Sequence, residues 1–171
     1  MSVAFEAMFK EILLVSVLGW SSIGWSDCPA RRGEESPTFS QVMYHFGRAT
    51  RVAGFLAIKG QSDPQAITKD QLSELENLAR IAAHCASLAA SPKADTGLWP
   101  RRSQSLTGRE LKIYLDRHRR LLVRFQSLLL QIEEHSCEMR LRDWLPEDFT
   151  RLKTLERDLL NLANYAHREM G

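Results

Sequence analysis

The strongest constraint on the fold of this 171-residue chain is the spacing of its apolar residues. They recur every three or four positions over four long stretches, which is the period of one face of an α-helix. No stretch alternates with the period of two that marks a half-buried strand, so the sequence predicts an all-α protein. The clearest stripe, between Thr107 and about Cys137, consists of Leu111, Leu115, His118, Leu122, Phe125, Leu129 and Ile132.

Three further helices are predicted on the same grounds. The first runs from about Thr38 to Lys59 and is expected to end at Gly60. The second runs from Thr68 to Ala90, with Thr68 and Gln71 forming a capping box, and the fourth begins at Pro146 and continues to the carboxyl terminus. Their apolar faces are Phe39, Val42, Phe46, Ala49, Ala53 and Leu56; Leu72, Leu75, Leu78, Ala82, Cys85 and Ala89; and Phe149, Leu152, Leu155, Leu159, Leu162 and Ala166.

Short connections between these helices predict an antiparallel up-down-up-down four-helix bundle, in which consecutive helices run in opposite directions. The start of the first helix and the end of the fourth then lie at the same end. Met43, Cys85, the turns from Leu111 to His118, and His167 are expected at this end, whereas Cys137 and Trp144 are expected at the other.

The amino-terminal stretch has the order of a secretory signal peptide. Lys10 precedes an apolar run from Ile12 to about Trp20, and small residues lead to a cleavage site after Ser26. The run is shorter than the roughly 20 apolar residues that a bilayer span needs, so no stable membrane span is expected after processing. The sequence thus predicts a signal peptide (1–26), a linker (27–37), a bundle (38–171) and a periplasmic or secreted protein. The alternative is a buried first helix from Ala4 to Leu18 in a cytoplasmic adaptor.

Composition and motifs exclude several classes of function. A net charge of +2, from 23 basic and 21 acidic residues, does not favour nucleic acid as a partner. Cys28, Cys85 and Cys137 lie far apart and form no C-x-x-C pair, so local spacing builds neither a zinc knuckle nor a thioredoxin-type motif. No metalloprotease motif, phosphate loop or nucleophile elbow is present, and no enzymatic activity is predicted.

The histidines also exclude a carboxylate-bridged di-iron site. Such bundles use E-x-x-H pairs, and no carboxylate stands three residues before any of the five histidines. His118 interrupts a leucine stripe, which favours a hydrogen-bonded core histidine over a ligand. The basic residues Arg117, Arg120 and Arg124 are expected on the solvated side of their helix.

A bundle of this length, with a methionine early in its first helix and a histidine near the end of its last, resembles the four-helix haem proteins of the cytochrome c-prime and soluble cytochrome b family. The resemblance covers about Phe39 to Met170. In the c-prime branch the last helix ends in C-x-x-C-H, and the cysteines hold the haem covalently. The matching stretch here is Ala163-Asn164-Tyr165-Ala166-His167, with alanine at both cysteine positions.

The resemblance therefore implies a b-type haem held without covalent bonds. Met43 and His167 would be its axial ligands, since a thioether and an imidazole on facing helices can bind one iron from both sides. His118 and His167 would form the alternative pair. The slot would be walled by Phe39, Phe46, Ala86, Leu111, Leu115 and Ala163.

Two hypotheses of function follow. The first is an exported haem-binding bundle for electron transfer or for haem or gas sensing, with a redox or protein partner. The second is a cofactor-free bundle that acts as a protein–protein interaction or adaptor module, anchored by exposed tryptophans at Trp99 and Trp144. Under the second hypothesis His167 is a cation at a helix carboxyl terminus, and Met43 is an ordinary core or edge methionine. Neither hypothesis predicts the oligomeric state.

Overall fold

The computed structural model describes residues 37, 39–91 and 105–170. The predicted signal segment, its cleavage site, most of the linker and Trp99 lie outside these residues. Over the described part, the chain forms four α-helices and one short 3₁₀ helix. They are α2 (Phe39–Ser62), η1 (Pro64–Ala66), α3 (Lys69–Ala90), α5 (Gly108–Leu141) and α6 (Pro146–Met170).

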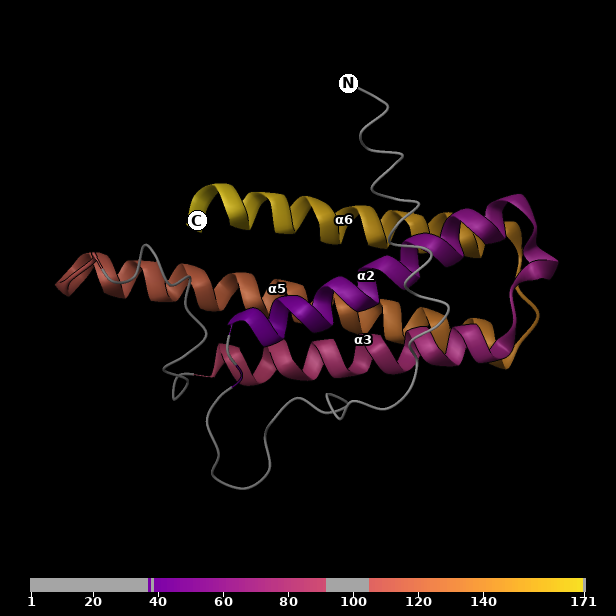
Figure 1. Cartoon of the computed structure of the whole chain (residues 1–171), viewed down its shortest axis with the longest axis horizontal. Coiled ribbons are helices and arrows are strands. Elements are labelled where there is room, and N and C mark those ends of the chain that lie inside the picture. The colour runs from indigo at the N-terminus through magenta and orange to yellow at the C-terminus, as the bar shows by residue number, and fades with distance from the viewer. Residues whose placement is uncertain (1–36, 38, 92–104, 171) are drawn as a thin grey trace.

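The helices form the predicted antiparallel bundle. Helix α2 lies between α3 and α6, and α5 lies between the same two helices on the opposite side, so α2 and α5 are diagonal neighbours. Figure 1 shows that the start of α2, the end of α3 and the end of α6 gather at one end, from which the first turns of α5 project. The prediction of an all-α, up-down four-helix bundle is confirmed.

The predicted apolar faces form the core. All six positions on α3, all six on α6, and those from Val42 to Leu56 on α2 are buried. Phe46 and Phe125 meet edge to face across the diagonal, with ring centroids 4.9 Å apart. Thr68 and Gln71 form the predicted capping box at the start of α3, with N–H···O distances of 3.2 and 3.0 Å.

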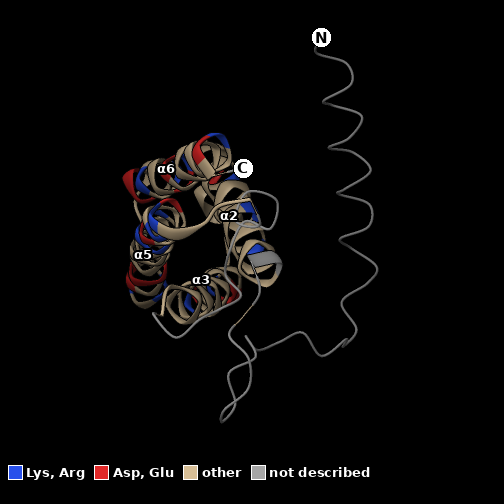
Figure 2. Cartoon of the chain, turned by 90° about the vertical axis from the view of Figure 1, so that its left-hand side faces the viewer, with Lys and Arg blue, Asp and Glu red and all other residues tan. Residues whose placement is uncertain are grey.

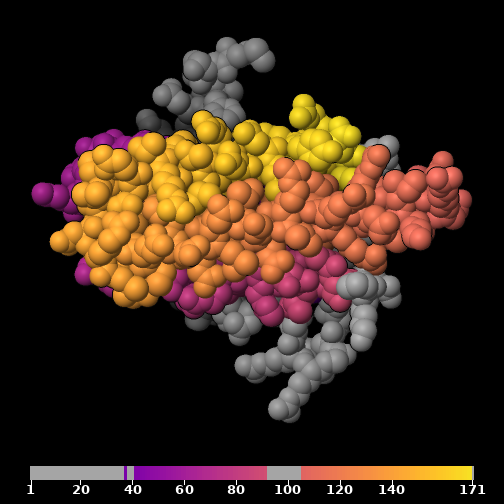
Figure 3. Space-filling view, turned by 180° about the vertical axis from the view of Figure 1, so that it is seen from behind, coloured from indigo at the N-terminus to yellow at the C-terminus, as the bar shows by residue number. Residues whose placement is uncertain are grey.

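Helix α5 departs from the prediction at both ends. Leu111 and Leu115 are only half-buried, because the first turns of α5 extend past the end of α6 (Figure 3). Tyr114 is buried instead, and its hydroxyl donates to the carbonyl of Met170 at 3.3 Å. At the other end the helix continues past Cys137 to Leu141, since the fully buried Met139 adds one more turn of core contact.

The prediction that Gly60 ends the first helix is wrong. Helix α2 continues through Gly60 to Ser62, and Gly60 is buried against Phe149 of α6. A Cβ atom at this position would overlap the Phe149 ring. The glycine is therefore required for the close approach of α2 and α6, and not for the termination of α2.

The α2–α3 and α5–α6 connections lie at the end of the bundle away from the start of α2, and we name this region the loop end. Hydrogen bonds hold the two connections together. The indole of Trp144 donates to the carbonyl of Pro64 at 2.9 Å, which joins the α5–α6 connection to η1. Trp144 is therefore half-buried and bonded within the chain, and its predicted role as an exposed anchor is wrong. Among the described helices, none combines the length and the apolar character needed to cross a bilayer.

Asp148 organises the same loop end. Both of its carboxylate oxygens accept hydrogen bonds from the guanidinium of Arg142 at 2.8 Å, and one also accepts from the amide of Leu145 at 2.8 Å. These bonds hold the pKa of Asp148 at about 2 despite its burial. The buried His135 donates from Nε2 to the carbonyl of Asp148 at 2.8 Å, so that α5 and α6 are joined where one helix leads to the other.

Candidate functional site

The three residues proposed as haem ligands occupy different environments. His118 is buried on the core side of α5, beside the ring of Tyr114. Met43 is half-buried and touches the edge of the core. His167 is exposed, whereas its neighbour Ala166 faces the core. A ligand to a haem between the helices has to lie on an interior face, and His167 does not.

Among the predicted walls of the haem slot, Phe46, Ala86 and Ala163 belong to the core or pack against it, and the side chain of Phe39 lies outside the described part. Phe46 and Ala86 are buried, and Leu111, Leu115 and Ala163 are half-buried. The aromatic contact between Phe46 and Phe125 occupies the interior one turn below Met43. The described residues contain no group of three or more histidine, cysteine or carboxylate side chains placed to hold a metal ion. The exposed position of His167 does not fit a haem between the helices, and ligation by Met43 and His167 stays a prediction from the resemblance.

A different feature distinguishes the outer face of α2. Tyr44, Phe55 and Ile58 are 49%, 50% and 57% exposed, although aromatic and branched apolar side chains are usually buried. They fall on one stripe because Tyr44 and Phe55 lie eleven residues, or three helical turns, apart. Two cations lie between them on the same stripe, Arg48 and Arg51. Together with Lys59, these residues form what we name the α2 surface.

The α2 surface carries positive charge without any compensating carboxylate on its own helix. The sequence of α2 contains Arg48, Arg51 and Lys59 and no aspartate or glutamate, and Figure 2 shows blue but no red on this helix. The cations also lie over the aromatic rings. The Arg48 guanidinium is 5.8 Å from the centroid of Tyr44, and the Lys59 ammonium is 5.7 Å from that of Phe55.

Arg48 also influences the ionisation of nearby groups. Burial lowers the pKa of His45, and the charge of Arg48 lowers it further. Burial raises the pKa of Glu74 on α3, and Arg48 opposes this increase. The positive charge at this part of α2 comes from Arg48 and Arg51.

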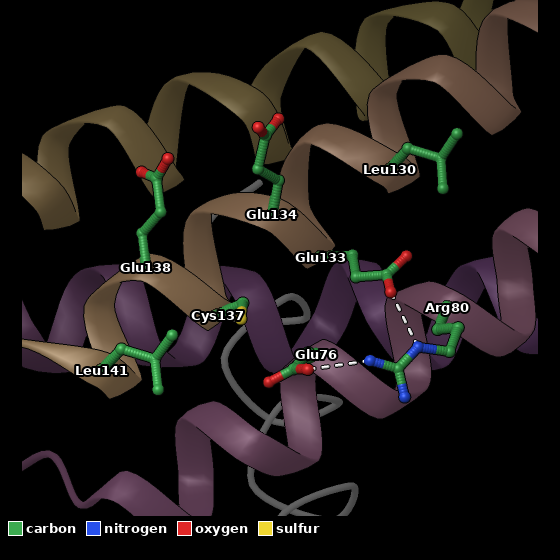
Figure 4. A pocket seen from close by; sticks show the side chains of 8 residues that line it. All are labelled: Glu76, Arg80, Leu130, Glu133, Glu134, Cys137, Glu138 and Leu141. Atoms are coloured by element: carbon green, nitrogen blue, oxygen red, sulfur yellow. Dashed lines mark hydrogen bonds and ion pairs between the residues drawn. The ribbon is translucent and has the colours of Figure 1, made fainter.

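A second feature is an open groove of about 450 Å³ between α3 and α5, which we name the α3/α5 groove. Figure 4 shows Leu130 and Leu141 at its two ends, with Cys137 between them on α5. Leu130 and Leu141 are 45% and 71% exposed. The remaining lining residues are charged: Glu76, Arg80, Glu133, Glu134 and Glu138.

An ion-pair network crosses the floor of the α3/α5 groove. Glu76 pairs with Arg80 at 2.8 Å and with Arg140 at 2.9 Å, and Arg80 also pairs with Glu133 at 2.7 Å. This network joins α3 to α5 and fixes the wall of the groove. Glu134 and Glu138 remain exposed beside it, so the outer rim of the groove is acidic.

The two described cysteines differ in state. Cys85 is fully buried and disulfide-bonded. Cys137 carries a free thiol that is half-buried in the α3/α5 groove. The spacing of the cysteines in the sequence did not predict this difference, because a disulfide depends on which residues the fold brings together.

The basic run on α5 is solvated as predicted. Arg117, Arg120 and Arg124 are exposed. Asp116 and Arg119 form an ion pair within the run at 3.8 Å. Their exposure is that of a hydrated helix face.

Sequence reasoning missed the α2 surface and the α3/α5 groove, although part of each signal was present. Tyr44, Phe55 and Ile58 fall off the predicted core face of their helix, and the segment from 39 to 62 lacks acidic residues. For the α3/α5 groove, Leu130 and Leu141 share an eleven-residue spacing on α5. Only the fold shows that α3 supplies the opposite wall.

Comparison with known proteins gives no further assignment. No family model, no curated protein and no solved structure matches the chain. The fold and the two surfaces are therefore the basis for the proposals below.

Proposed function

We propose that this bundle is an interaction module without a cofactor, which binds an amphipathic helix with acidic side chains along the α2 surface. The observation that carries the proposal is the exposed stripe of Tyr44, Phe55 and Ile58 between cationic residues. Aromatic side chains next to arginine are typical of the residues that contribute most to protein–protein binding. This is the interaction hypothesis predicted from the sequence, with its anchors on α2 in place of the tryptophans.

A helix is the partner that best matches the α2 surface. Tyr44 and Phe55 lie about 16 Å apart along the axis of α2 at 1.5 Å per residue. A second helix laid alongside would meet both with apolar residues eleven positions apart, the usual mode of recognition between amphipathic helices. Acidic residues between its apolar positions would face Arg48 and Arg51.

The charges of the α2 surface make it selective for an acidic helix. Three cations without a carboxylate on α2 attract an acidic helix and repel a basic one. The interaction is expected to weaken as salt increases, because charges at an exposed surface are screened over about 8 Å at physiological ionic strength.

A pair of designed peptides tests the proposal. One helix-forming peptide carries two leucines eleven positions apart with glutamates between them, and the other has lysine in place of each glutamate. We expect the acidic peptide to bind the purified chain, as measured by fluorescence anisotropy, and the basic peptide to bind at least tenfold more weakly. Phe55→Ala and Arg51→Glu should each reduce the affinity for the acidic peptide by tenfold or more.

Val123→Ala and Arg124→Glu are the matched controls, because Val123 and Arg124 are an exposed apolar residue and an exposed arginine on α5. Both variants should bind the acidic peptide like the original chain. Equal binding of the two peptides, or equal effects of the α2 and control variants, would refute the proposal.

Export is part of the same proposal. The predicted signal segment supports it, and so does the disulfide-bonded state of Cys85, since disulfides persist mainly in oxidising compartments. Intact mass of the protein from its native host should correspond to a chain beginning at Asp27. Alkylation of the unfolded protein before reduction should label Cys137 and leave Cys85 unlabelled. A retained Met1 or a labelled Cys85 would contradict export.

Haem binding by Met43 and His167, with His118 as the alternative partner, stays a prediction of the family resemblance. The exposed position of His167 gives it no support. Titration with hemin decides the question. The proposal of a cofactor-free module expects no shift of the Soret band on mixing and no increase in melting temperature, whereas a shift that His167→Ala removes would establish the haem hypothesis.

A further inference from the structure

We infer that the helix bound by the α2 surface is supplied by a second copy of this chain, through its α3/α5 groove. This inference rests on the proposed function and names the partner. The groove presents α5, an acidic helix face with apolar residues at both ends, which is the chemistry that the α2 surface fits. The two surfaces belong to the same chain, so every copy carries both halves of the contact.

The apolar residues of the two surfaces have the same spacing. Tyr44 and Phe55 lie eleven residues apart on α2, and Leu130 and Leu141 lie eleven residues apart on α5. Each pair therefore spans about 16 Å along its helix axis. With the two helices side by side, both apolar residues of one surface meet both apolar residues of the other.

The two surfaces differ in the sign of their net charge. Arg48 and Arg51 stand between Tyr44 and Phe55, at positions that correspond to the acidic Glu134 and the uncharged Cys137 between Leu130 and Leu141. The lining of the groove has four glutamates and one arginine, and Arg140 also pairs with Glu76, so the groove with its ion-pair network has a net charge of −2. The α2 surface has two arginines and one lysine, a net charge of +3. Complementary potentials of this kind set the register and speed the encounter of two surfaces.

The position of the two surfaces determines the form of the assembly. Helices α2 and α5 are diagonal in the bundle, so the surfaces lie on different faces of one molecule. A contact between unlike surfaces is heterologous, and each bound copy leaves one surface of each kind open. The expected product is a series of oligomers that grows with concentration, and not a closed two-fold dimer.

Sedimentation velocity of the purified chain at low ionic strength tests this inference. We expect the weight-average sedimentation coefficient to increase with protein concentration and to decrease with added salt. A chain that remains monomeric up to about 1 mM overturns the inference. A dissociation constant of this size corresponds to an association free energy of only about −4 kcal/mol.

Charge reversal tests the identity of the contact. The double variant Arg48→Glu with Arg51→Glu makes both surfaces acidic, and Glu134→Arg with Glu138→Arg makes both basic. Each double variant alone should associate at least tenfold more weakly than the original chain. An equimolar mixture should recover association, because each variant then offers an oppositely charged surface to the other.

The matched control for the Arg48 and Arg51 variant is Arg117→Glu with Arg124→Glu, which makes the same change of net charge on the exposed face of α5 outside the groove. It should associate like the original chain. Association that persists in either double variant, or a mixture that stays monomeric, overturns the inference. If the acidic peptide binds the α2 surface while the chain remains monomeric, the proposed function stands and the second copy is not the partner. If the acidic peptide does not bind and the chain remains monomeric, both the proposed function and this inference are wrong.

Discussion

The two ends of the bundle are held together in different ways. At the loop end, Trp144 bonds to Pro64, 80 residues away, and His135 and Asp148 make hydrogen bonds that hold the connection between α5 and α6. At the opposite end, which we name the open end, the first turns of α5 extend past α6, and the hydroxyl of Tyr114 donates a longer bond to the carbonyl of Met170 at 3.3 Å. Apolar burial is complete around Phe149 and Met139 at the loop end, whereas Leu111 and Leu115 at the open end are only half-buried. The loop end is thus expected to open last and the open end first.

Substitution of two glycines of α2 is expected to give the largest difference in stability between the two ends of the bundle. At the loop end, Gly60→Ala places a methyl group in the Phe149 ring, and we expect a loss of about 3 kcal/mol in unfolding free energy. Nearer the open end, a Cβ at Gly47 has no atom within 4 Å, and Gly47→Ala should stabilise the helix by about 1 kcal/mol. Urea unfolding measures both. Similar changes in unfolding free energy for the two variants would show that α2 and α6 are held no more tightly at the loop end than at the open end.

The pH dependence of stability tests how much the ionised Asp148 stabilises the loop end. Arg142 lowers the pKa of this carboxyl from an ordinary value near 3.8 to about 2, so its stabilising effect is present above pH 4 and is lost as the pH falls towards 2. The shift corresponds to about 2 kcal/mol. We expect Asp148→Asn to be less stable by about this amount at pH 7 and to converge with the original chain near pH 2.

Asp143→Asn is the control for this measurement, since Asp143 is exposed and adjacent in the same connection. Its stability relative to the original chain should change little between pH 7 and pH 2. Parallel stability profiles for Asp148→Asn and the original chain would show that the Arg142 pair does not hold the loop end.

The smallest expected effect compares one hydrogen bond at each end. Trp144→Phe removes the donor to Pro64, and we expect a loss of about 1 kcal/mol. Tyr114→Phe removes the longer bond to Met170 and should cost roughly half as much. Amide hydrogen exchange gives the sharper measurement. Trp144→Phe should raise exchange in η1, and Tyr114→Phe should raise it in the last turn of α6. The reverse order of the two losses would contradict the comparison.

The fold could be read from the sequence because a four-helix bundle is built from local signals. The stripes of α3 and α6 are regular, so burial follows from helical period without knowledge of the partner helices. The capping box at Thr68 is equally local. Prediction failed where a residue serves a contact distant in sequence. Gly60 looked like a helix stop because its contact with Phe149 is invisible locally, and Trp144 looked exposed because its partner Pro64 lies 80 residues away.

The candidate site was less predictable than the fold for the same reason. Family resemblance directed attention to Met43 and His167, although the predicted apolar face of the last helix contains Ala166 and therefore already places His167 off that face. The α2 surface was recoverable in part, since a stripe that falls off the core face and lacks acidic residues is a local pattern. The α3/α5 groove was not, because its walls come from two helices.

By itself, the sequence determined that this chain forms amphipathic helices, which faces they bury, and that short connections make them antiparallel. Period and connection length suffice for these conclusions, since both act within a few residues. The tertiary structure decided which polar groups pair at the loop end, which apolar residues stay exposed on α2 and α5, and that Cys85 and Cys137 differ in state. These properties depend on the rotation of each helix against its neighbours, which is set by the packing of the whole core.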